Sequence, residues 1–111
     1  MTITVKNIIP RKQAENVQTS QYTAVNCKTV IDKFTVTNTT GAAVIFSVNL
    51  VAGAGSASAS NLVVSSKSIA AGETYNCPEL VGQCLEASGF ISTLAGAATS
   101  LTISATGREI T

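Results

Sequence analysis

Residues 28–50, KTVIDKFTVTNTTGAAVIFSVNL, decide the fold class of this chain. The stretch contains two segments in which apolar and polar residues alternate, and the turn 38–41 separates them. The alternate apolar positions are Val30, Phe34 and Val36 in the first segment, and Val44, Phe46, Val48 and Leu50 in the second. An alternation of period two places one face of a β-strand on a core. The stretch therefore predicts two consecutive strands joined by a short turn.

The same rhythm of strand and turn continues to Glu109. Further strands are expected at residues 18–25, 62–66, 90–94 and 100–105. About seven strands at this spacing are typical of a sandwich of two antiparallel sheets. One short helix is expected over residues 78–85, because Pro suits the first position of a helix and an early Glu complements its dipole. The expected fold class is therefore an all-β, antiparallel β-sandwich with one short helix.

Length and composition limit the possible functions. At 111 residues and 11.3 kDa the chain has the size of one domain with a modest core. Only 12% of its residues are charged, which predicts that part of the surface is covered in an assembly. A surface rich in Ser and Thr can also stay soluble unaided. The net charge of +1 gives no electrostatic basis for nucleic-acid binding. Residues 1–12 lack the apolar run of a signal peptide, and no apolar run could span a membrane, so we expect synthesis in a cytoplasm.

Residues 1–17 are expected to form an extended N-terminal arm, and residues 18–111 the β-sandwich domain. Its apolar residues, which are candidate assembly contacts, are Ile3, Val5, Ile8 and Ile9. Pro10 cannot continue a central strand, and the polar run at residues 11–18 separates the arm from the core. Burial of the four apolar side chains on a neighbouring subunit would then stabilise an assembly. The alternative is that the arm adds a strand to its own sheet.

The sequence contains no motif for catalysis, a cofactor or a metal ion. The chain has no His, which removes the usual general base near neutral pH and the commonest metal ligand. Scattered carboxylates without the spacing of an acid–base pair are Asp32, Glu73, Glu79, Glu86 and Glu109. Residues 52–61 contain Gly-Ala-Gly-Ser but lack the Lys-Ser/Thr of a P-loop, so a mobile surface loop is expected there. We therefore expect a protein without enzymatic activity and without a cofactor.

Three cysteines, Cys27, Cys77 and Cys84, allow several interpretations. A zinc site needs four ligands at short spacings, which three Cys without His do not supply. A regular helix would place Cys77 and Cys84 about 10 Å apart along its axis, too far for a disulfide. An internal bridge would need a non-helical segment between them, or Cys27 as a partner. Free thiols are expected in a cytoplasm, and the odd count leaves a bond between subunits open.

Five short stretches resemble sequences in a group of small virion proteins of tailed bacteriophages. They are residues 32–38 (DKFTVTN), 48–51 (VNLV), 69–74 (IAAGET), 79–82 (ELVG) and 105–109 (ATGRE). The resemblance covers residues 18–111, and its stretches are turns and strand ends. It implies an immunoglobulin-like or jelly-roll-like sandwich that is added to the capsid, the neck or the tail, and it carries over no catalytic residue.

The expected function is that of a non-enzymatic structural subunit of a tailed-phage virion. The neck or collar at the head-to-tail junction is the first placement, and capsid decoration is the second. The expected partners are portal, connector, capsid or tail proteins, with the chain present in many copies or as a homo-oligomer, and neither nucleic acid nor a membrane is expected. The alternative is a receptor- or carbohydrate-binding module on a tail appendage. That class usually exposes aromatic side chains for stacking, and this chain has five Phe and Tyr residues and no Trp.

Overall fold

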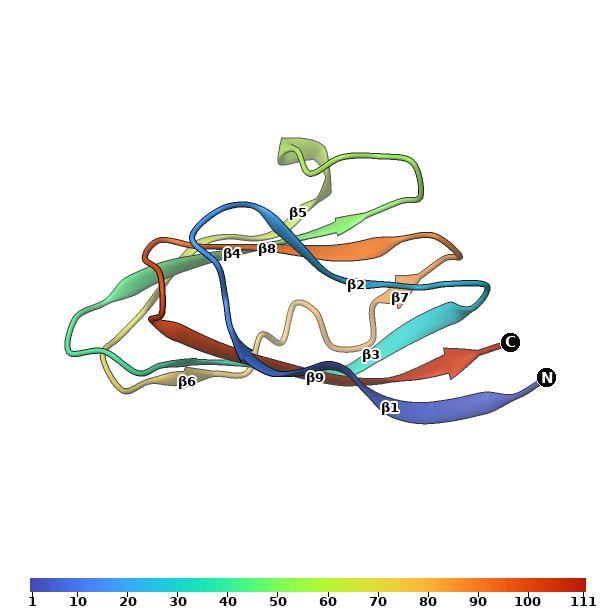
Figure 1. The fold of residues 1–111 in the computed structure, drawn as a ribbon, viewed down its shortest axis with the longest axis horizontal. Helices are drawn as coiled ribbons and strands as arrows, with labels where there is room; N and C mark the ends of the chain where they lie inside the picture. Colours follow the sequence, from blue (N-terminus) through green and yellow to red (C-terminus); the bar gives the residue numbers. More distant parts are fainter.

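Nine strands and one short 3₁₀ turn make up the chain, which a computed structural model describes over all residues 1–111 (Figure 1). The elements are β1 (Ile3–Gln13), β2 (Thr19–Thr23), β3 (Lys28–Asn38), β4 (Val44–Val51), η1 (Ala59–Asn61), β5 (Leu62–Ile69), β6 (Thr74–Tyr75), β7 (Cys84–Leu85), β8 (Phe90–Ala95) and β9 (Leu101–Ile110). The prediction of an all-β fold is confirmed, and every strand expected from the alternation is present. The structure adds β1 and the two-residue strands β6 and β7.

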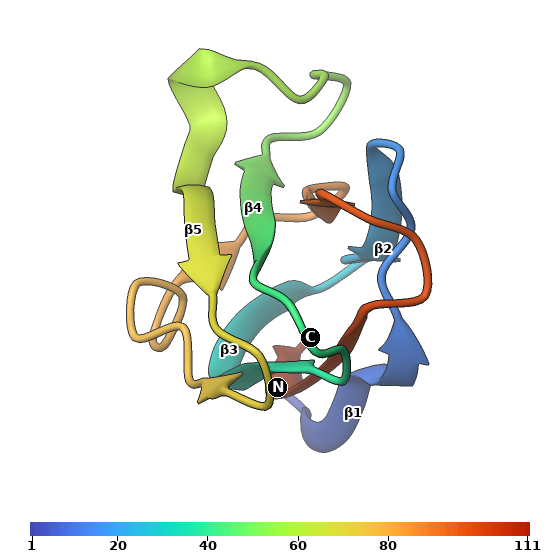
Figure 2. The same ribbon diagram turned by 90° about the vertical axis from the view of Figure 1, so that its left-hand side faces the viewer.

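Two antiparallel sheets form the two layers of the molecule (Figure 2). The first has the order β1-β9-β3-β6, with β7 also paired to β3, and the second has the order β2-β8-β4-β5. Most connections cross from one sheet to the other, including the turn that follows Asn38. Only β4 and β5 are consecutive strands that pair with each other by a full hairpin ladder. The alternation seen in the sequence therefore builds two facing layers rather than a series of hairpins.

The core lies between the two sheets. Phe34 of β3 and Phe46 of β4 are fully buried and face each other across the layers, with ring centroids 6.2 Å apart. Both belong to one connected cluster of 21 buried residues. Each fully buried aliphatic or aromatic side chain in such a cluster stabilises the fold by about 1.5–3 kcal/mol.

The first strand of the deciding stretch contains a break in its alternation. The pairing of β3 with β9 shifts by one residue between Ile31 and Lys33, which places Asp32 in a β-bulge. As a result Ile31 is fully buried, whereas Val30 is only half-buried. The expectation that Val30 shares the core face with Phe34 and Val36 is therefore wrong.

The N-terminal segment is a strand of the protein's own sheet, which is the alternative to a separate arm. β1 pairs antiparallel with β9, and its register shifts between Lys6 and Ile9 and again between Ile9 and Lys12. The second shift contains Pro10, so that residue lies where an edge strand tolerates a missing N–H. Pro10 would be excluded from a central strand, but β1 lies at the edge of its sheet, and the bulge accommodates the residue there.

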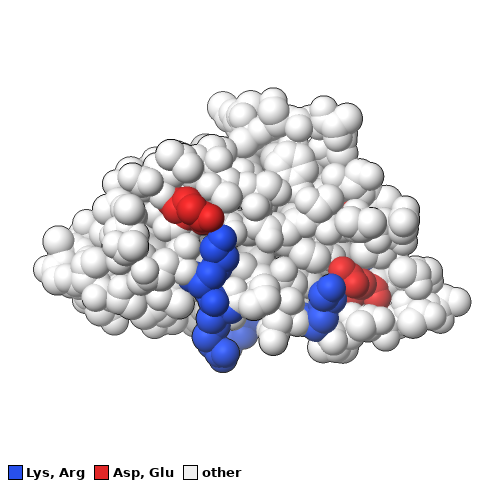
Figure 3. Space-filling view, in the orientation of Figure 1, with Lys and Arg blue, Asp and Glu red and all other residues white.

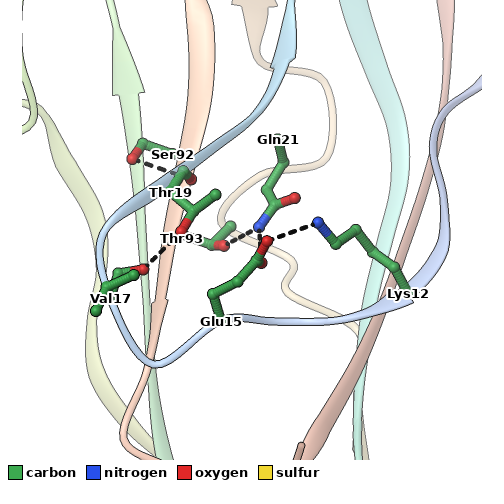
Figure 4. Close-up of polar contacts among 7 residues, drawn as sticks. All are labelled: Lys12, Glu15, Val17, Thr19, Gln21, Ser92 and Thr93. Carbon is green, nitrogen blue, oxygen red and sulfur yellow. Dashed lines mark hydrogen bonds and ion pairs between the residues drawn. The ribbon is translucent and has the colours of Figure 1, made fainter. Parts of the chain in front are cut away.

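The polar segment after β1 also belongs to the fold (Figure 4). The carboxylate of Glu15 accepts hydrogen bonds from Lys12 Nζ at 3.0 Å and from Gln21 Nε2 at 2.9 Å. Gln21 Nε2 also donates to Thr93 Oγ1 of β8 at 2.9 Å, and the N–H of Ala95 donates to the carbonyl of Glu15 at 3.1 Å. These contacts fix the connection from β1 to β2 against the second sheet, so residues 11–18 do not separate β1 from the core.

Residues 78–85 form turns and β7 instead of the expected helix. The N–H of Gly82 donates to the carbonyl of Ile31 at 2.7 Å, and the N–H of Ile31 donates to the carbonyl of Gln83 at 2.9 Å. Cys77 and Gly82 have positive φ values of 44° and 84°, which interrupt helical geometry. Backbone groups that a helix would use internally are thus bonded to the edge of β3, and Leu80 is fully buried there.

The Gly- and Ser-rich loop is tied to the second sheet. Asn49 of β4 donates from Nδ2 to the carbonyl of Ser58 at 2.9 Å and to Asn61 Oδ1 at 2.7 Å. Asn61 in turn donates to the carbonyl of Ser56 at 2.9 Å. Two asparagines therefore anchor a loop whose small side chains bury little area.

Candidate assembly surface

The four predicted contact residues separate into two pairs. Ile8 and Ile9 are buried in the protein's own core, with exposed fractions of 4% and 1%. Ile3 and Val5 are exposed, with fractions of 51% and 74%. The bulge between Lys6 and Ile9 explains the difference, because it turns both Ile8 and Ile9 inward while Ile3 and Val5 stay on the outer side. Ile8 and Ile9 are therefore not available to a neighbouring subunit.

β1 is the outer strand of its sheet, and it is the longest open edge of the molecule. The opposite edge of the same sheet consists of β6 and β7, with two residues each. In the second sheet, β2 has five residues, and β5 is distorted where Ser66 adopts a positive φ of 46°. Short strands and bulges are common protections against unwanted edge pairing. The stretch from Ile3 to Lys6 has neither protection, because the first register shift of β1 comes after it.

The unpaired hydrogen-bonding groups of this edge can be assigned from the register. Thr2 and Thr111 exchange two backbone hydrogen bonds, of 3.0 and 2.9 Å. Alternate residues of an antiparallel strand bond to opposite sides, so Thr4 and Lys6 also face β9. The N–H and C=O groups of Ile3 and Val5 consequently point away from β9 toward the open edge. A further strand could bond there without disturbing the existing sheet.

Polar contacts hold the end of β1 in place beside this edge. Lys6 Nζ lies 3.4 Å from Glu109 Oε2, and Glu109 accepts a 2.5 Å hydrogen bond from the Tyr22 hydroxyl. The hydrogen bond from Tyr22, together with the charge of Lys6, lowers the pKa of Glu109. Burial and the neighbouring carboxylate raise the pKa of Tyr22. Tyr22 also contacts Thr29 Oγ1 at 2.7 Å, so the group joins β1, β2, β3 and β9.

The outer face next to the edge combines apolar and charged residues. Ile3 lies opposite Ile110, and Val5 lies opposite Arg108. The guanidinium of Arg108 donates to both carboxylate oxygens of Asp32 at 3.0–3.2 Å. This ion pair is largely exposed and contributes little to stability, but it limits the apolar patch to the Ile3 and Val5 side of the face.

The scattered carboxylates do not meet one another. Glu73 accepts from the N–H of Ala70 at 2.7 Å, and Glu86 lies 3.6 Å from Lys28. Glu79 accepts from the Tyr75 hydroxyl at 2.6–2.8 Å, which lowers the pKa of Glu79 and raises that of Tyr75 to about 12. No three Cys, Asp or Glu side chains lie close enough together to hold a metal ion.

The three cysteines occupy different environments as free thiols. Cys27 and Cys77 are buried, and Cys84 is exposed on β7. Burial raises the pKa of the Cys77 thiol to about 12, which keeps it protonated and unreactive near neutral pH. Cys84 is thus the one cysteine that a neighbouring subunit can reach.

Comparison of the chain with models of protein families, with curated proteins and with solved structures finds no match. The resemblance to phage virion proteins therefore remains a prediction from the sequence. The chain also forms no helix with the length and hydropathy that a membrane crossing requires.

Sequence reasoning identified Ile3 and Val5 but could not identify the open backbone edge beside them. The partner of β1 is β9, at the other end of the chain, and no local pattern reports that pairing. A weak signal was present in the alternation Thr2-Ile3-Thr4-Val5-Lys6, which has the period of a strand.

Proposed function

We propose that this protein is a non-enzymatic structural subunit of a tailed-phage virion that joins its neighbours through the open edge of β1. The neck or collar at the head-to-tail junction is the preferred position, and capsid decoration is the second. The observation that carries the assembly role is the unprotected edge at Ile3 and Val5, where exposed β-branched side chains accompany unpaired backbone groups. The low charge content of 12% agrees with a surface that is partly covered.

The strand order supports one of the two expected sandwich types. We infer a jelly roll, because the orders β1-β9-β3-β6 and β2-β8-β4-β5 give two four-stranded sheets whose connections mostly cross between the layers. The short strand β7 is an addition beside β3. Jelly rolls are frequent in viral capsid proteins and also in lectins. The order therefore favours the jelly-roll form over the immunoglobulin-like one and agrees with both candidate functions.

The receptor- or carbohydrate-binding alternative receives less support from the aromatic residues. Phe34 and Phe46 are fully buried. The hydroxyls of Tyr22 and Tyr75 bond to carboxylates, and the Tyr75 ring lies under Lys67 Nζ at 4.9 Å. A sugar ring needs an exposed aromatic face for stacking. Phe90 is the one aromatic residue that is neither fully buried nor held by a polar contact, and it is half-buried.

The virion assignment is tested by mass spectrometry and electron cryo-microscopy of phage particles whose genome encodes the chain. We expect many copies per particle, and density for the sandwich at the neck or on the capsid surface. If purified particles lack the chain, or carry it only at the tips of tail appendages, the proposed position is wrong.

The role of the β1 edge is tested separately with two variants of one residue. V5P removes the N–H that points to the open edge, whereas V5T keeps it and keeps a β-branched side chain. Both variants should remain folded by circular dichroism, and only V5P should fail to enter particles. Equal incorporation of V5P and V5T would contradict assembly through this edge.

A further inference from the structure

The outer face of the β1-β9-β3 sheet contains a polar hollow of about 240 Å³. Three neighbouring strands line it, and each strand contributes two residues. They are Asn7 and Arg11 of β1, Ser104 and Thr106 of β9, and Lys33 and Thr35 of β3. None of the six is apolar or acidic. The hollow is separate from the Ile3 and Val5 edge, because it lies over the bulged half of β1.

The register arranges these six side chains in two rows across the sheet. Lys33 lies opposite Thr106, and Thr35 lies opposite Ser104. On the other side of β9, the bulges of β1 bring Asn7 beside Thr106 and Arg11 beside Ser104. Small hydroxyl side chains therefore form the floor on the central strand, and the two cations stand at diagonal corners. Since adjacent strands lie about 4.8 Å apart, the backbones of β1 and β3 are about 10 Å apart. Long Arg and Lys side chains can converge from both sides over such a floor.

The two cations of the hollow have no anionic partner in the protein. Four of the seven Lys and Arg residues form ion pairs with carboxylates. The other three are Arg11, Lys33 and Lys67, and Lys67 lies over the Tyr75 ring. Figure 3 shows the basic side chains that cross the β1 side of the molecule, with acidic groups beside only part of them. Arg11 and Lys33 thus give the hollow a local positive charge that no carboxylate of the chain neutralises.

The polar side chains of the hollow are also free of hydrogen bonds within the chain. By contrast, Asn38, Asn49 and Asn61 each make two or more side-chain hydrogen bonds. Thr35, Ser104 and Thr106 are half-buried, and their hydroxyls are available as donors because they make no hydrogen bond within the chain. Two cations above a floor of hydroxyl and amide donors match the requirements of an oxyanion.

We propose that this hollow binds a small dianionic oxyanion of the phosphate class. Its three or four terminal oxygens can accept bonds from Arg11, Lys33 and the hydroxyl floor at once. A carboxylate, with one charge and two coplanar oxygens, satisfies fewer of these donors. This inference is independent of the proposed virion role, because it rests on a different part of β1 and requires no second subunit.

The experiment is an NMR titration of the full chain with inorganic phosphate at pH 7.5, with ionic strength held constant by sodium chloride. We expect saturable shifts of backbone amides at residues 33–35 and 104–106, with sulfate giving the same pattern and acetate at least tenfold weaker binding. The variant R11Q/K33Q should lose at least tenfold in affinity for phosphate. The control K67Q removes the third unpaired cation, far from the hollow in the strand order, and should bind phosphate as the unaltered chain does.

Several results would overturn the proposal. One is the absence of saturation at millimolar phosphate in 50-fold molar excess over the protein. Another is a set of chemical-shift changes spread evenly over all lysines and arginines. A third is an equal loss of phosphate affinity in R11Q/K33Q and in K67Q. Acetate binding as tightly as phosphate would also overturn the assignment to a dianionic ligand. Because Arg11 and Lys33 are exposed, the amide spectrum of the double variant should otherwise match that of the unaltered chain and thereby confirm its fold.

Discussion

The side-chain amide of Asn38 donates a hydrogen bond to the backbone carbonyl of Ile69, 2.9 Å away, and this contact joins the two sheets. Asn38 ends β3 and Ile69 ends β5. The same amide nitrogen donates to the carbonyl of Ala42 at 2.8 Å, and the amide oxygen accepts from the N–H of Thr40 at 2.9 Å. Asn38 is almost fully buried, so one side chain links the two sheets at the turn 38–41.

The substitution N38A should lower the free energy of unfolding by about 1–3 kcal/mol, because it removes the buried hydrogen bond to the carbonyl of Ile69. Urea denaturation followed by circular dichroism measures the change. N16A is the matched control, since Asn16 is exposed, and it should differ from the unaltered chain by less than about 0.5 kcal/mol. Similar losses for both variants would show that Asn38 does not hold the sheets together.

Gly107 is required by the close approach of β9 to β3. A Cβ atom at this position would overlap the carbonyl oxygen of Val30. G107A should therefore cost about 1–3 kcal/mol of stability, as overpacking of a core does. An added Cβ at Gly41 meets nothing within 4 Å, so G41A should be nearly neutral. Thermal unfolding of the two variants side by side tests this, and an unaltered midpoint for G107A would refute it.

The burial of Ile9 predicts that β1 contributes to folding as well as to assembly. I9A should lose about 2–5 kcal/mol in unfolding free energy, and V5A should lose less than about 0.5 kcal/mol. Deletion of residues 2–12 should unfold the chain, because it removes Ile8 and Ile9 and exposes the edge of β9. A deletion variant that stays monomeric, folded and as stable as the full chain would restore the view of a separate arm.

The hydrogen bond from Tyr22 predicts part of the acid sensitivity of the fold. It lowers the pKa of Glu109 below the ordinary value of 4.5, so ionised Glu109 stabilises the folded state above that pH. This stabilisation is lost as the pH falls through the folded-state pKa. Y22F should raise the pKa of Glu109, and its stability deficit should shrink as the pH falls below about 4.5.

Carbon NMR titration of the Glu carboxyl groups measures this effect directly. Y75F serves as the comparison, because Tyr75 bonds to Glu79 and lowers the pKa of that carboxyl instead. Each variant should move the pKa of its own partner upward. If Y22F leaves the titration of Glu109 unaltered, the hydrogen bond does not set its pKa.

The exposure of Cys84 predicts that one thiol per folded chain reacts rapidly with Ellman's reagent. Cys27 and Cys77 should react only after unfolding, because both are buried. C84S should abolish the fast phase, and it should also abolish any disulfide between subunits seen on non-reducing electrophoresis. A fast phase of the same size in C84S would mean that a buried cysteine becomes accessible in the native state.

The strands were predictable from the sequence because the alternation of period two reports which face of a strand is buried. Phe34, Val36, Phe46 and Val48 all lie in the core as this pattern requires. Bulges break the pattern without a local signal in the sequence. The burial of Ile31 in place of Val30 was therefore not predictable. The helix expected over residues 78–85 was wrong because good starting residues cannot outweigh backbone bonds to β3, which only the folded chain offers.

The candidate sites were predictable only in part. Ile3 and Val5 were identifiable as apolar residues in a polar segment, but their open backbone groups depend on the pairing with β9. Arg11 and Lys33 come from strands that never touch, and β9 lies between them. Their convergence depends on three strands and two bulges, and no spacing in the sequence reports it.

The pairing of β1 with β9 also determines when this protein can fold. β1 leaves the ribosome well before β9, which is the one strand of this chain that it pairs with. At a translation rate of about 5–20 residues per second, Ile8 and Ile9 stay exposed for roughly 5 to 20 seconds until β9 has been synthesised and can cover them. Pairing between such distant segments is also slow once both have been synthesised. The newly made protein therefore passes through a period in which two aggregation-prone strand edges are unpaired. Its yield in a cell depends on how few other unfolded chains it encounters during that period.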